Sequence, residues 1–385
     1  MYISDDIRYI GVNDHQLDLF EGQYIVPQGM AYNSYLILDE QIAVMDSVDK
    51  NFTGEWLANI RAEIGERPVD YLIVQHMEPD HSGSLAAFMA AYPKAVVVAS
   101  AKAFAMMQAF FGEEYATRRR IVTEGDKLAL GRHTLSFVAA PMVHWPEVIM
   151  TYDETDKVFF SADAFGKFGA LDTEDEWACE ARRYYFGIVG KYGAQVQALL
   201  KKAARLDIEK ICPLHGPVLD ENLGEYIRLY DVWSSYGVES EGVAIACASI
   251  YGNTMQAAML LRDELLARGC KNVALTDLAR DDKAEAIEDA FRYGKLVLAS
   301  ATYNGDVFPC MRTFIEGLTE RNYQNRTVAL MENGSWAPNA AKVMRGMLEK
   351  SKNLTFTQTS VRIASALSDD SRAQIAALAD ELTQA

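Results

Sequence analysis

The sequence of 385 residues predicts an α+β domain at residues 1–240, followed by an α/β domain at residues 241–385 that contains a doubly wound, five-stranded parallel sheet. Three observations lead to this fold class. A chain of this length is expected to form two domains, at about 150 residues each. Short apolar runs joined by turn residues fill the first part, as in hairpins and meanders. From about Gly242 similar runs alternate with helical patterns, which is typical of a parallel sheet with crossover helices.

The first domain is expected to consist of short strands with helices between them. Asp39 and Glu40 mark one hairpin turn, Gly131 marks a second, and residues 154–156 mark a third. A helix is predicted over 101–111. The expected strands and hairpins are, in chain order, 35–48, 69–75, 94–100, 128–140, 148–163 and 208–212.

The second domain shows the strand-helix alternation most clearly. Its first helix is predicted to run from a hydroxyl N-cap at Thr254 to Gly269, with an inward stripe that includes Ala258, Leu261 and Leu265. The polar segment 238–242 precedes the first strand, and we place the domain boundary there. The five expected strands are 243–249, 272–278, 295–301, 327–333 and 354–363.

Composition restricts the class of partner and the compartment. Half of the residues are apolar and 24% are charged, as in ordinary globular proteins, and the net charge is 37 − 54 = −17. Such an acidic chain repels nucleic acid and anionic membrane surfaces. The N-terminus lacks a signal-peptide pattern, and no apolar run approaches the roughly 18 residues of a membrane span, so a cytoplasmic protein is expected. The five cysteines are scattered and form no C-x-x-C pair, which predicts reduced thiols.

Seven possible metal ligands follow predicted strands in the first domain. Four of them crowd the segment directly after strand 69–75, and the other three each follow a separate strand. Imidazole and carboxylate ligands in this number suffice for two metal ions and leave positions open for a substrate. We expect His15 and His133 to be ordinary surface or hydrogen-bonded residues. The candidate ligands are His76, Glu78, Asp80, His81, His144, Asp163 and His215.

The motif H-x-E-x-D-H with distant His, Asp and His resembles the metallo-β-lactamase fold, whose hydrolases typically carry H-x-H-x-D-H and bind zinc. Glu78 stands where those enzymes have histidine. That exchange resembles the flavodiiron proteins, also called A-type flavoproteins, in which a metallo-β-lactamase-like αββα sandwich holds a di-iron centre and a flavodoxin-like domain follows. The segments HWPE, SADAFGKFG and PLHGPV are also similar to that family, although the family often has aspartate where Glu147 stands.

The resemblance implies a division of the ligands between two iron ions. One iron would be held by His76, Glu78 and His144, and the other by Asp80, His81 and His215, with Asp163 as the bridge. Tyr24, Tyr35 and Trp145 could tune such a centre, but we expect them to pack in the core.

Three loops of the second domain are candidates for a phosphate and flavin site. The turn SIYGNT leads from the first strand into a helix, where backbone N–H groups and short hydroxyl and amide side chains can hold a phosphate. The loops after the third and fourth strands should lie at the same edge of the sheet. No G-x-G-x-x-G or P-loop motif is present.

This pattern resembles flavodoxin and implies FMN, although Trp336 is equally compatible with ordinary packing. The predicted FMN-binding residues are Ser249, Ile250, Tyr251, Gly252, Asn253 and Thr254 in the first loop, Ala301, Thr302, Tyr303, Asn304 and Gly305 in the second, and Gly334, Ser335 and Trp336 in the third.

The family resemblance implies an oxidoreductase that reduces dioxygen to water or nitric oxide to nitrous oxide. Of these two substrates, we favour dioxygen. The sequence contains no rubredoxin-type C-x-x-C module, so a separate donor is expected, a rubredoxin or a reduced deazaflavin. A head-to-tail homodimer, or a tetramer built from such dimers, is also implied.

Two alternatives remain open at this level. A zinc hydrolase with an appended flavodoxin domain would use a metal-bound hydroxide as nucleophile. A flavin electron carrier or gas sensor would contain an inert metal site.

Overall fold

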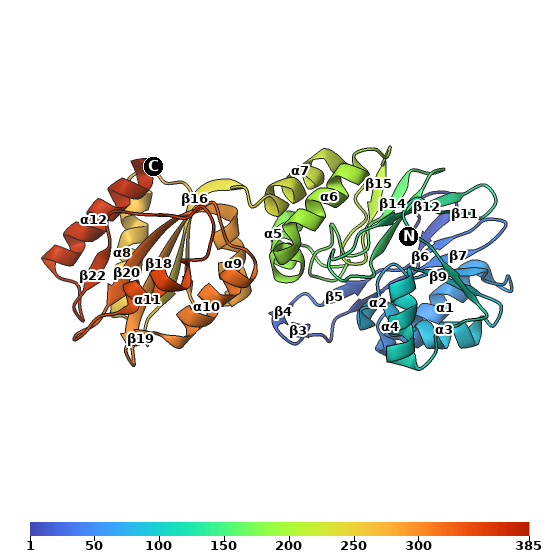
Figure 1. Ribbon diagram of the computed structural model, residues 1–385, viewed down its shortest axis with the longest axis horizontal. Coiled ribbons are helices and arrows are strands. Elements are labelled where there is room, and N and C mark those ends of the chain that lie inside the picture. Colours follow the sequence, from blue (N-terminus) through green and yellow to red (C-terminus); the bar gives the residue numbers. More distant parts are fainter. Residues whose placement is uncertain (385) are drawn as a thin grey trace. The chain divides into compact units, whose positions relative to one another are not determined.

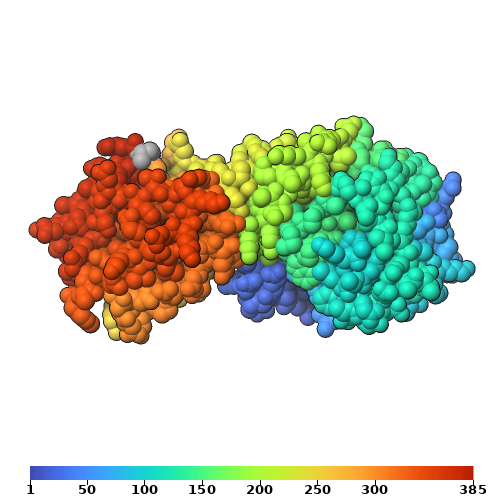
Figure 2. All heavy atoms as spheres, in the orientation of Figure 1, coloured from blue at the N-terminus to red at the C-terminus, as the bar shows by residue number. Residues whose placement is uncertain are grey.

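The computed structural model describes residues 1–384, which form two compact units, one from Met1 to Asp231 and one from Val232 onward. Each unit is a continuous stretch of chain, coloured from blue to green and from yellow to red, respectively, in Figures 1 and 2. The predicted fold classes, α+β and then α/β, are confirmed. Within residues 1–384, every helix is too short or too polar to serve as a membrane span.

The N-terminal unit contains a six-stranded and a five-stranded sheet. The first has the order β1-β6-β7-β8-β9-β10 and the second the order β11-β12-β13-β14-β15, while β2 pairs with β5 and β3 with β4 in two small ribbons. The strand bounds are β1 Ile7–Tyr9, β2 Val12–Asp14, β3 Leu19–Phe20, β4 Tyr24–Ile25, β5 Met30–Tyr32, β6 Tyr35–Ile37, β7 Ala43–Met45, β8 Tyr71–Ile73, β9 Val96–Ala99, β10 Arg119–Ile121, β11 Lys127–Ala129, β12 Thr134–Ala139, β13 Ile149–Asp153, β14 Val158–Phe160 and β15 Lys210–Cys212.

Helices lie on the outer sides of both sheets, which gives a four-layer αββα sandwich (Figure 1). The helix bounds are α1 Thr53–Ile64, α2 Pro79–Ser82, α3 Leu85–Ala91, α4 Ala101–Phe111, α5 Trp177–Tyr184, α6 Gly193–Ala203 and α7 Leu223–Ser234, with helical turns at Lys50–Phe52, Tyr185–Val189 and Gly190–Tyr192.

The helix predicted over 101–111 is present as α4, but α1, α2, α3, α5, α6 and α7 were not predicted individually. In α1 the buried residues Trp56, Ile60 and Ile64 recur every four positions, a spacing that would have revealed the helix.

The two sheets enclose an apolar core and bring several strand ends to one edge. Side chains such as Met45 and Ile73 from one sheet and Phe137 and Phe160 from the other are fully or almost fully buried in this core. Strands β7, β8 and β9 are parallel to one another, as are β14 and β15. Because parallel strands end at the same edge of a sheet, the loops that follow β8, β14 and β15 are available to build one site.

The C-terminal unit has a parallel sheet of order β17-β16-β18-β20-β21, with β19 and β22 as additional pairings. The chain reverses its direction of strand addition between β16 and β18, which is the switch point of a doubly wound sheet. The element bounds are β16 Ser240–Ala248, α8 Asn253–Ala267, β17 Val273–Asp277, α9 Lys283–Arg292, β18 Tyr293–Tyr303, β19 Asp306–Val307, α10 Pro309–Glu320, β20 Thr327–Asn333, α11 Ala340–Met347, β21 Thr355–Phe356, β22 Val361–Ile363 and α12 Asp369–Gln384.

Two details differ from the expectations for this unit. The predicted fifth strand is divided into β21 and β22, both parallel to β20. The N-cap of α8 is Gly252, with φ of 91°, and not Thr254, which lies inside the first helical turn. Glycine adopts this left-handed conformation without the steric penalty of a side chain, and so the turn can pass directly into the helix.

His133 connects the two sheets of the N-terminal unit at one edge. Its Nδ1 lies 2.9 Å from Asp153 Oδ2 at the end of β13, and its Nε2 lies 3.3 Å from Asp6 Oδ2 just before β1. The charged neighbours Arg132 and Asp156 share this cluster. Burial alone would lower the pKa of His133, but the hydrogen bond to Asp153 and the surrounding carboxylates outweigh burial and raise it.

We predict that His133 stabilises the protein in a pH-dependent way. Because its folded-state pKa is raised, its contribution is complete below the unfolded-state pKa of about 6.5 and is lost as the pH rises through the folded-state pKa. The difference in free energy of unfolding between the wild type and His133→Gln should therefore shrink from pH 6 to pH 9 in denaturant titrations. A difference that stays constant over this range would contradict the prediction.

Candidate metal centre and cofactor cavity

The seven candidate ligands lie in loops at the ends of strands in the N-terminal unit. Two follow β8 directly, two lie in the short helix α2, one lies between β12 and β13, and one each follows β14 and β15. The side chains are buried or nearly so, with Glu78 the most accessible of them, at 13% side-chain exposure. In this order the ligands are His76, Glu78, Asp80, His81, His144, Asp163 and His215.

The structure brings His76, Glu78, His144 and Asp163 into one cluster, with one potential ligand atom from each within 4.8 Å of the others. His144 Nε2 lies 2.9 Å from Asp163 Oδ2 and 3.1 Å from Glu78 Oε2. The Nε2 atoms of His76 and His144 are 3.3 Å apart. Two imidazoles and two carboxylates therefore point at one small volume.

Asp80, His81 and His215 form a second cluster. The Nε2 atoms of His81 and His215 are 3.0 Å apart, and each lies 3.3 Å from Asp80 Oδ2. Asp163 reaches this cluster as well, since its Oδ1 lies 3.2 Å from His81 Nε2 while its Oδ2 faces His144. One carboxylate thus contacts both groups of imidazoles.

The chemistry of these contacts fits a pair of cations. His76 Nδ1 is 2.8 Å from Glu147 Oε1 and His215 Nδ1 is 2.7 Å from the carbonyl oxygen of Ala31, so both rings can donate their proton away from the clusters. Their Nε2 lone pairs then face inward, as metal ligands require. Within the described chain, both carboxylate oxygens of Asp80 are buried without a hydrogen-bond partner. A metal ion would satisfy these atoms.

The carboxylates of the clusters favour positive charge on the imidazoles beside them. Burial alone would lower the pKa of His144, but hydrogen bonds to Asp163 and Glu78 raise it to about 9. Burial alone would raise the pKa of Asp163, but the nearby charges of His76 and His81 hold it well below its ordinary value. A site that favours protonated imidazoles over neutral ones also attracts metal cations.

Two buried residues that the sequence did not indicate contribute to this site. Asp46, with a left-handed φ of 55°, accepts hydrogen bonds from the backbone N–H of Gln75 at 2.7 Å and from the Gln75 side chain at 2.8 Å, which fixes the segment that leads into the ligands. The ring centroid of Tyr184 lies 5.4 Å from that of His215, and its hydroxyl has no hydrogen-bond partner among residues 1–384. Burial, followed by the charge of Asp163, raises the pKa of Tyr184 well above its ordinary value.

The three aromatic residues considered from the sequence have different environments. The hydroxyl groups of Tyr24 and Tyr35 donate to the carbonyl oxygens of Gly187 and Pro213, at 2.8 and 2.7 Å, and both rings are buried in the unit. The ring centroid of Trp145 lies 5.2 Å from that of His76, so this residue packs directly against a candidate ligand.

The predicted FMN loops line one cavity of about 530 Å³ in the C-terminal unit. All predicted residues except Gly252 and Tyr303 contribute to its wall, and Asn333, Ala337 and Ser365 contribute in addition. Tyr251 and Trp336 are 93% and 82% exposed, so neither fills a packing position within this chain. The cavity lies at the carboxyl ends of β16, β18 and β20, where doubly wound sheets bind ligands.

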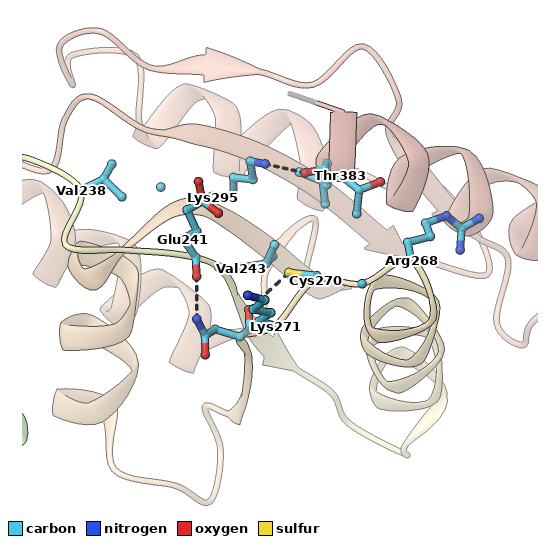
Figure 3. Close-up of a pocket in the computed structure, with 13 residues that line it drawn as sticks. Val238, Glu241, Val243, Arg268, Cys270, Lys271, Lys295 and Thr383 are labelled. Carbon is cyan, nitrogen blue, oxygen red and sulfur yellow. Dashed lines mark hydrogen bonds between the residues drawn. The ribbon is translucent and has the colours of Figure 1, made fainter.

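A second cavity of about 490 Å³ lies at the opposite, amino end of this sheet (Figure 3). Two of its basic side chains, Arg268 and Lys295, already interact within the protein. Arg268 pairs with Glu264 and with Asp380, the latter at 2.6 Å, and Lys295 Nζ donates to the carbonyl oxygen of Leu382 at 2.6 Å. The first cavity, in contrast, presents a helix N-terminus and short hydroxyl and amide side chains.

Comparison with known proteins agrees with this geometry. Residues 30–216 match the family model described as ODP family beta lactamase. The anaerobic nitric oxide reductase flavorubredoxin of Salmonella arizonae is 29% identical over 357 residues, which cover 88% of this chain and 73% of that protein. The nitric oxide reductase of Moorella thermoacetica is 28% identical over 360 residues, covering 91% and 90%.

Solved structures share the fold over the whole length. The rubredoxin oxygen:oxidoreductase of Desulfovibrio gigas superposes with a TM-score of 0.92 at 24% identity, covering 100% of this chain and 98% of that one. The flavodiiron protein of Giardia intestinalis also gives 0.92 at 24% identity, covering 99% and 95%.

The fold and site together define a class of protein, in which a β-lactamase-like domain with a candidate metal centre is followed by a flavodoxin-like domain. The similarity to the flavodiiron proteins that the H-x-E-x-D-H motif indicated agrees with these matches, since two relatives are named as nitric oxide reductases and one structural neighbour as a flavodiiron protein. The predicted cofactors, FMN and a di-iron centre, agree with the names flavorubredoxin and flavodiiron protein, and the observed clusters fit a pair of metal ions.

Proposed function

We propose that this protein is a flavodiiron oxidoreductase that reduces nitric oxide to nitrous oxide or dioxygen to water, with electrons relayed through FMN. The observation that carries the proposal is the carboxylate of Asp163 between two buried clusters of imidazole and carboxylate groups. The names of the Salmonella and Moorella relatives support nitric oxide, and the name of the Desulfovibrio protein supports dioxygen, the gas expected first from the sequence.

The ligand assignment is part of this proposal. His76, Glu78 and His144 would hold one iron, Asp80, His81 and His215 the other, and Asp163 would bridge them. The arrangement of the two clusters and the position of Asp163 between them support this division. Such a metal pair can deliver two electrons at once to a bound small molecule.

The protein's own residues would orient the ligands, exclude water and hold a proton. Glu147 and the carbonyl oxygen of Ala31 orient the rings of His76 and His215. The aromatic ring of Phe20, whose centroid is 5.5 Å from that of His215, covers the second cluster on one side. Tyr184 keeps its hydroxyl proton, because burial and the nearby carboxylates oppose ionisation.

In the C-terminal unit, the turn from Ser249 to Thr254 would hold the FMN phosphate. Its backbone is already folded back, since Gly252 N–H donates to Ser249 Oγ at 3.1 Å, and α8 starts at the next residue. A helix N-terminus favours negative charge through its free N–H groups and its dipole. The loops that contain Thr302 and Ser335 would border the ring, because they line the same cavity.

An external electron donor is part of the proposal, and the relatives' names, flavorubredoxin and rubredoxin oxygen:oxidoreductase, support a rubredoxin over a reduced deazaflavin. The strongly acidic chain is consistent with a cytoplasmic enzyme that binds neither nucleic acid nor membranes. A head-to-tail homodimer, or a tetramer of such dimers, completes the proposal.

The decisive experiment starts with the anaerobic protein reduced through a rubredoxin. Flavin and rubredoxin reoxidation are followed separately after dioxygen or nitric oxide is added, with iron and FMN quantified on the same sample. We expect rapid reoxidation with about two irons per chain, and the faster gas identifies the preferred substrate. Zinc with esterase turnover would instead indicate a hydrolase, and flavin without iron or gas consumption would indicate an electron carrier or sensor.

A further inference from the structure

We propose that Glu147 is a positioning residue that makes the two sites bind iron with different strength. Its carboxylate accepts a hydrogen bond from the His76 ring, whereas the imidazoles of the second site lack a carboxylate partner of this kind within residues 1–384. This inference rests on the proposed di-iron function and concerns a residue that is not itself a ligand.

The Glu147 side chain is placed to act on His76. It is fully buried, and its Oε1 accepts hydrogen bonds from His76 Nδ1 at 2.8 Å and from the backbone N–H of Met77 at 2.9 Å. Both donors belong to the segment that follows β8. One oxygen atom therefore fixes the orientation of the imidazole ring and of the backbone that carries it.

The main chain around Glu147 is itself held from two directions. Ser100, the N-cap of α4, donates its hydroxyl to the Glu147 carbonyl oxygen at 2.8 Å. Two residues further, Ile149 N–H donates to the carbonyl oxygen of Gln75 at 3.1 Å, which joins the start of β13 to the residue before His76. The carboxylate is thus preorganised and does not depend on a flexible loop.

The same loop carries the second imidazole of this cluster. His144 lies three residues before Glu147, and the loop is closed by a hydrogen bond of 2.7 Å from Met142 N–H to the carbonyl oxygen of Trp145. His144 reaches the cluster from this loop directly, and His76 is tied to the loop through Glu147. Glu147 therefore fixes the relative position of the two imidazoles proposed to hold one iron.

The imidazoles of the other cluster lack a charged hydrogen-bond acceptor at Nδ1 within residues 1–384. His215 donates to a neutral backbone carbonyl, that of Ala31, at 2.7 Å, and His81 Nδ1 has no hydrogen-bond partner within residues 1–384. A carboxylate partner makes an imidazole a stronger metal ligand than a neutral acceptor does, and loss of such partners typically weakens metal binding about 10- to 100-fold. We therefore expect the iron at His76 to depend on Glu147, and the iron at His215 to be independent of it.

The test compares iron release from the holoprotein to a chelator for the wild type, Glu147→Gln and Glu147→Leu. Glutamine has the same shape and can accept both hydrogen bonds through its amide oxygen, but it lacks the charge. We expect one of the two irons to leave at least about ten-fold faster in Glu147→Gln, and faster still in Glu147→Leu, while the other leaves at the wild-type rate. A purely structural role predicts wild-type release from Glu147→Gln and would overturn the inference, as would equal acceleration of both irons.

Asp153→Asn is a matched control. Asp153 is a fully buried carboxylate of the same unit that faces an imidazole Nδ1, that of His133, at 2.9 Å, outside both clusters. This variant should release both irons at the wild-type rate. If the wild type itself does not hold about two irons, the proposed function fails; if it does and Glu147→Gln releases iron like the wild type, only the positioning role fails.

Discussion

Replacement of Asp163 by alanine is expected to remove most of the bound iron and to lower gas reduction at least about 100-fold, while FMN stays bound. Asp163 is fully buried, and its two oxygens face different clusters, at 2.9 Å from His144 Nε2 and 3.2 Å from His81 Nε2. Without this carboxylate, the imidazoles of both clusters lose the negative charge between them. Loss of a residue that is hydrogen-bonded to a metal ligand typically lowers metal affinity about 10- to 100-fold. Loss of a ligand that is shared by both ions should therefore lower the affinity further.

The measurement is iron and FMN content on the same purified sample, followed by gas consumption with a reduced rubredoxin. His81→Ala should give the same pattern, with a smaller effect on the cluster that contains His76. Wild-type turnover in both variants would refute the ligand assignment.

A complementary variant in the other unit distinguishes loss of FMN from loss of iron. Thr254 is buried in the first turn of α8, lines the predicted FMN cavity, and its hydroxyl accepts a hydrogen bond of 3.3 Å from Asn333 Nδ2. Thr254→Ala should therefore weaken FMN binding and leave the iron content unchanged. Loss of iron in this variant would show that iron content reports general instability of the chain.

The sequence indicated the candidate metal site well because metal ligands belong to few residue types. Histidine is rare in this chain, with six copies, so four histidines after strands form a recognisable pattern. The parallel pairing of β14 with β15 then places the segments after these strands at one edge, and Asp163 and His215 become neighbours although 52 positions separate them.

The residues that support the ligands could not be found in this way. Glu147, Asp46 and Tyr184 are common residue types, and each acts through a partner that is distant in sequence, for example His76 for Glu147. For His133, too, the sequence neighbours do not reveal the partners of the side chain. Its sequence neighbours contain no acid within two positions, yet the folded chain places Asp6 and Asp153 at its ring.

Helices were predicted less well than strands in the N-terminal unit. The π-helical turn Tyr185–Val189 directly continues α5, and α2 has only four residues, so neither shows a stable period of 3.6 in the sequence. The strands of the C-terminal unit were easier to predict, because buried parallel strands are continuous apolar runs.

Arg326→Met is expected to destabilise the C-terminal unit by about 3 kcal/mol or more, which corresponds to a decrease of roughly 10 °C in its unfolding temperature. Arg326 is 3% exposed and directly precedes β20. Its guanidinium donates to the carbonyl oxygens of Tyr236 at 2.8 Å and Gly237 at 2.7 Å, and also to that of Phe291. Methionine can fill much of the volume but cannot donate these hydrogen bonds, and each bond lost from a buried carbonyl group costs about 1–3 kcal/mol.

The destabilisation caused by Arg326→Met should change the release of FMN and leave the iron content unchanged. Strand β20 starts next to Arg326 and ends at Asn333, which lines the proposed FMN cavity, so FMN should be released at a lower temperature on heating. Flavin fluorescence reports this release, and the iron content at room temperature should equal that of the wild type.

Arg345→Met is the matched control in the same unit, because Arg345 is exposed and its guanidinium lies 4.0 Å from the ring centroid of Phe356, a contact worth about 1 kcal/mol or less. If both variants released flavin at the same temperature, the buried hydrogen bonds of Arg326 would contribute no more to stability than a surface contact does.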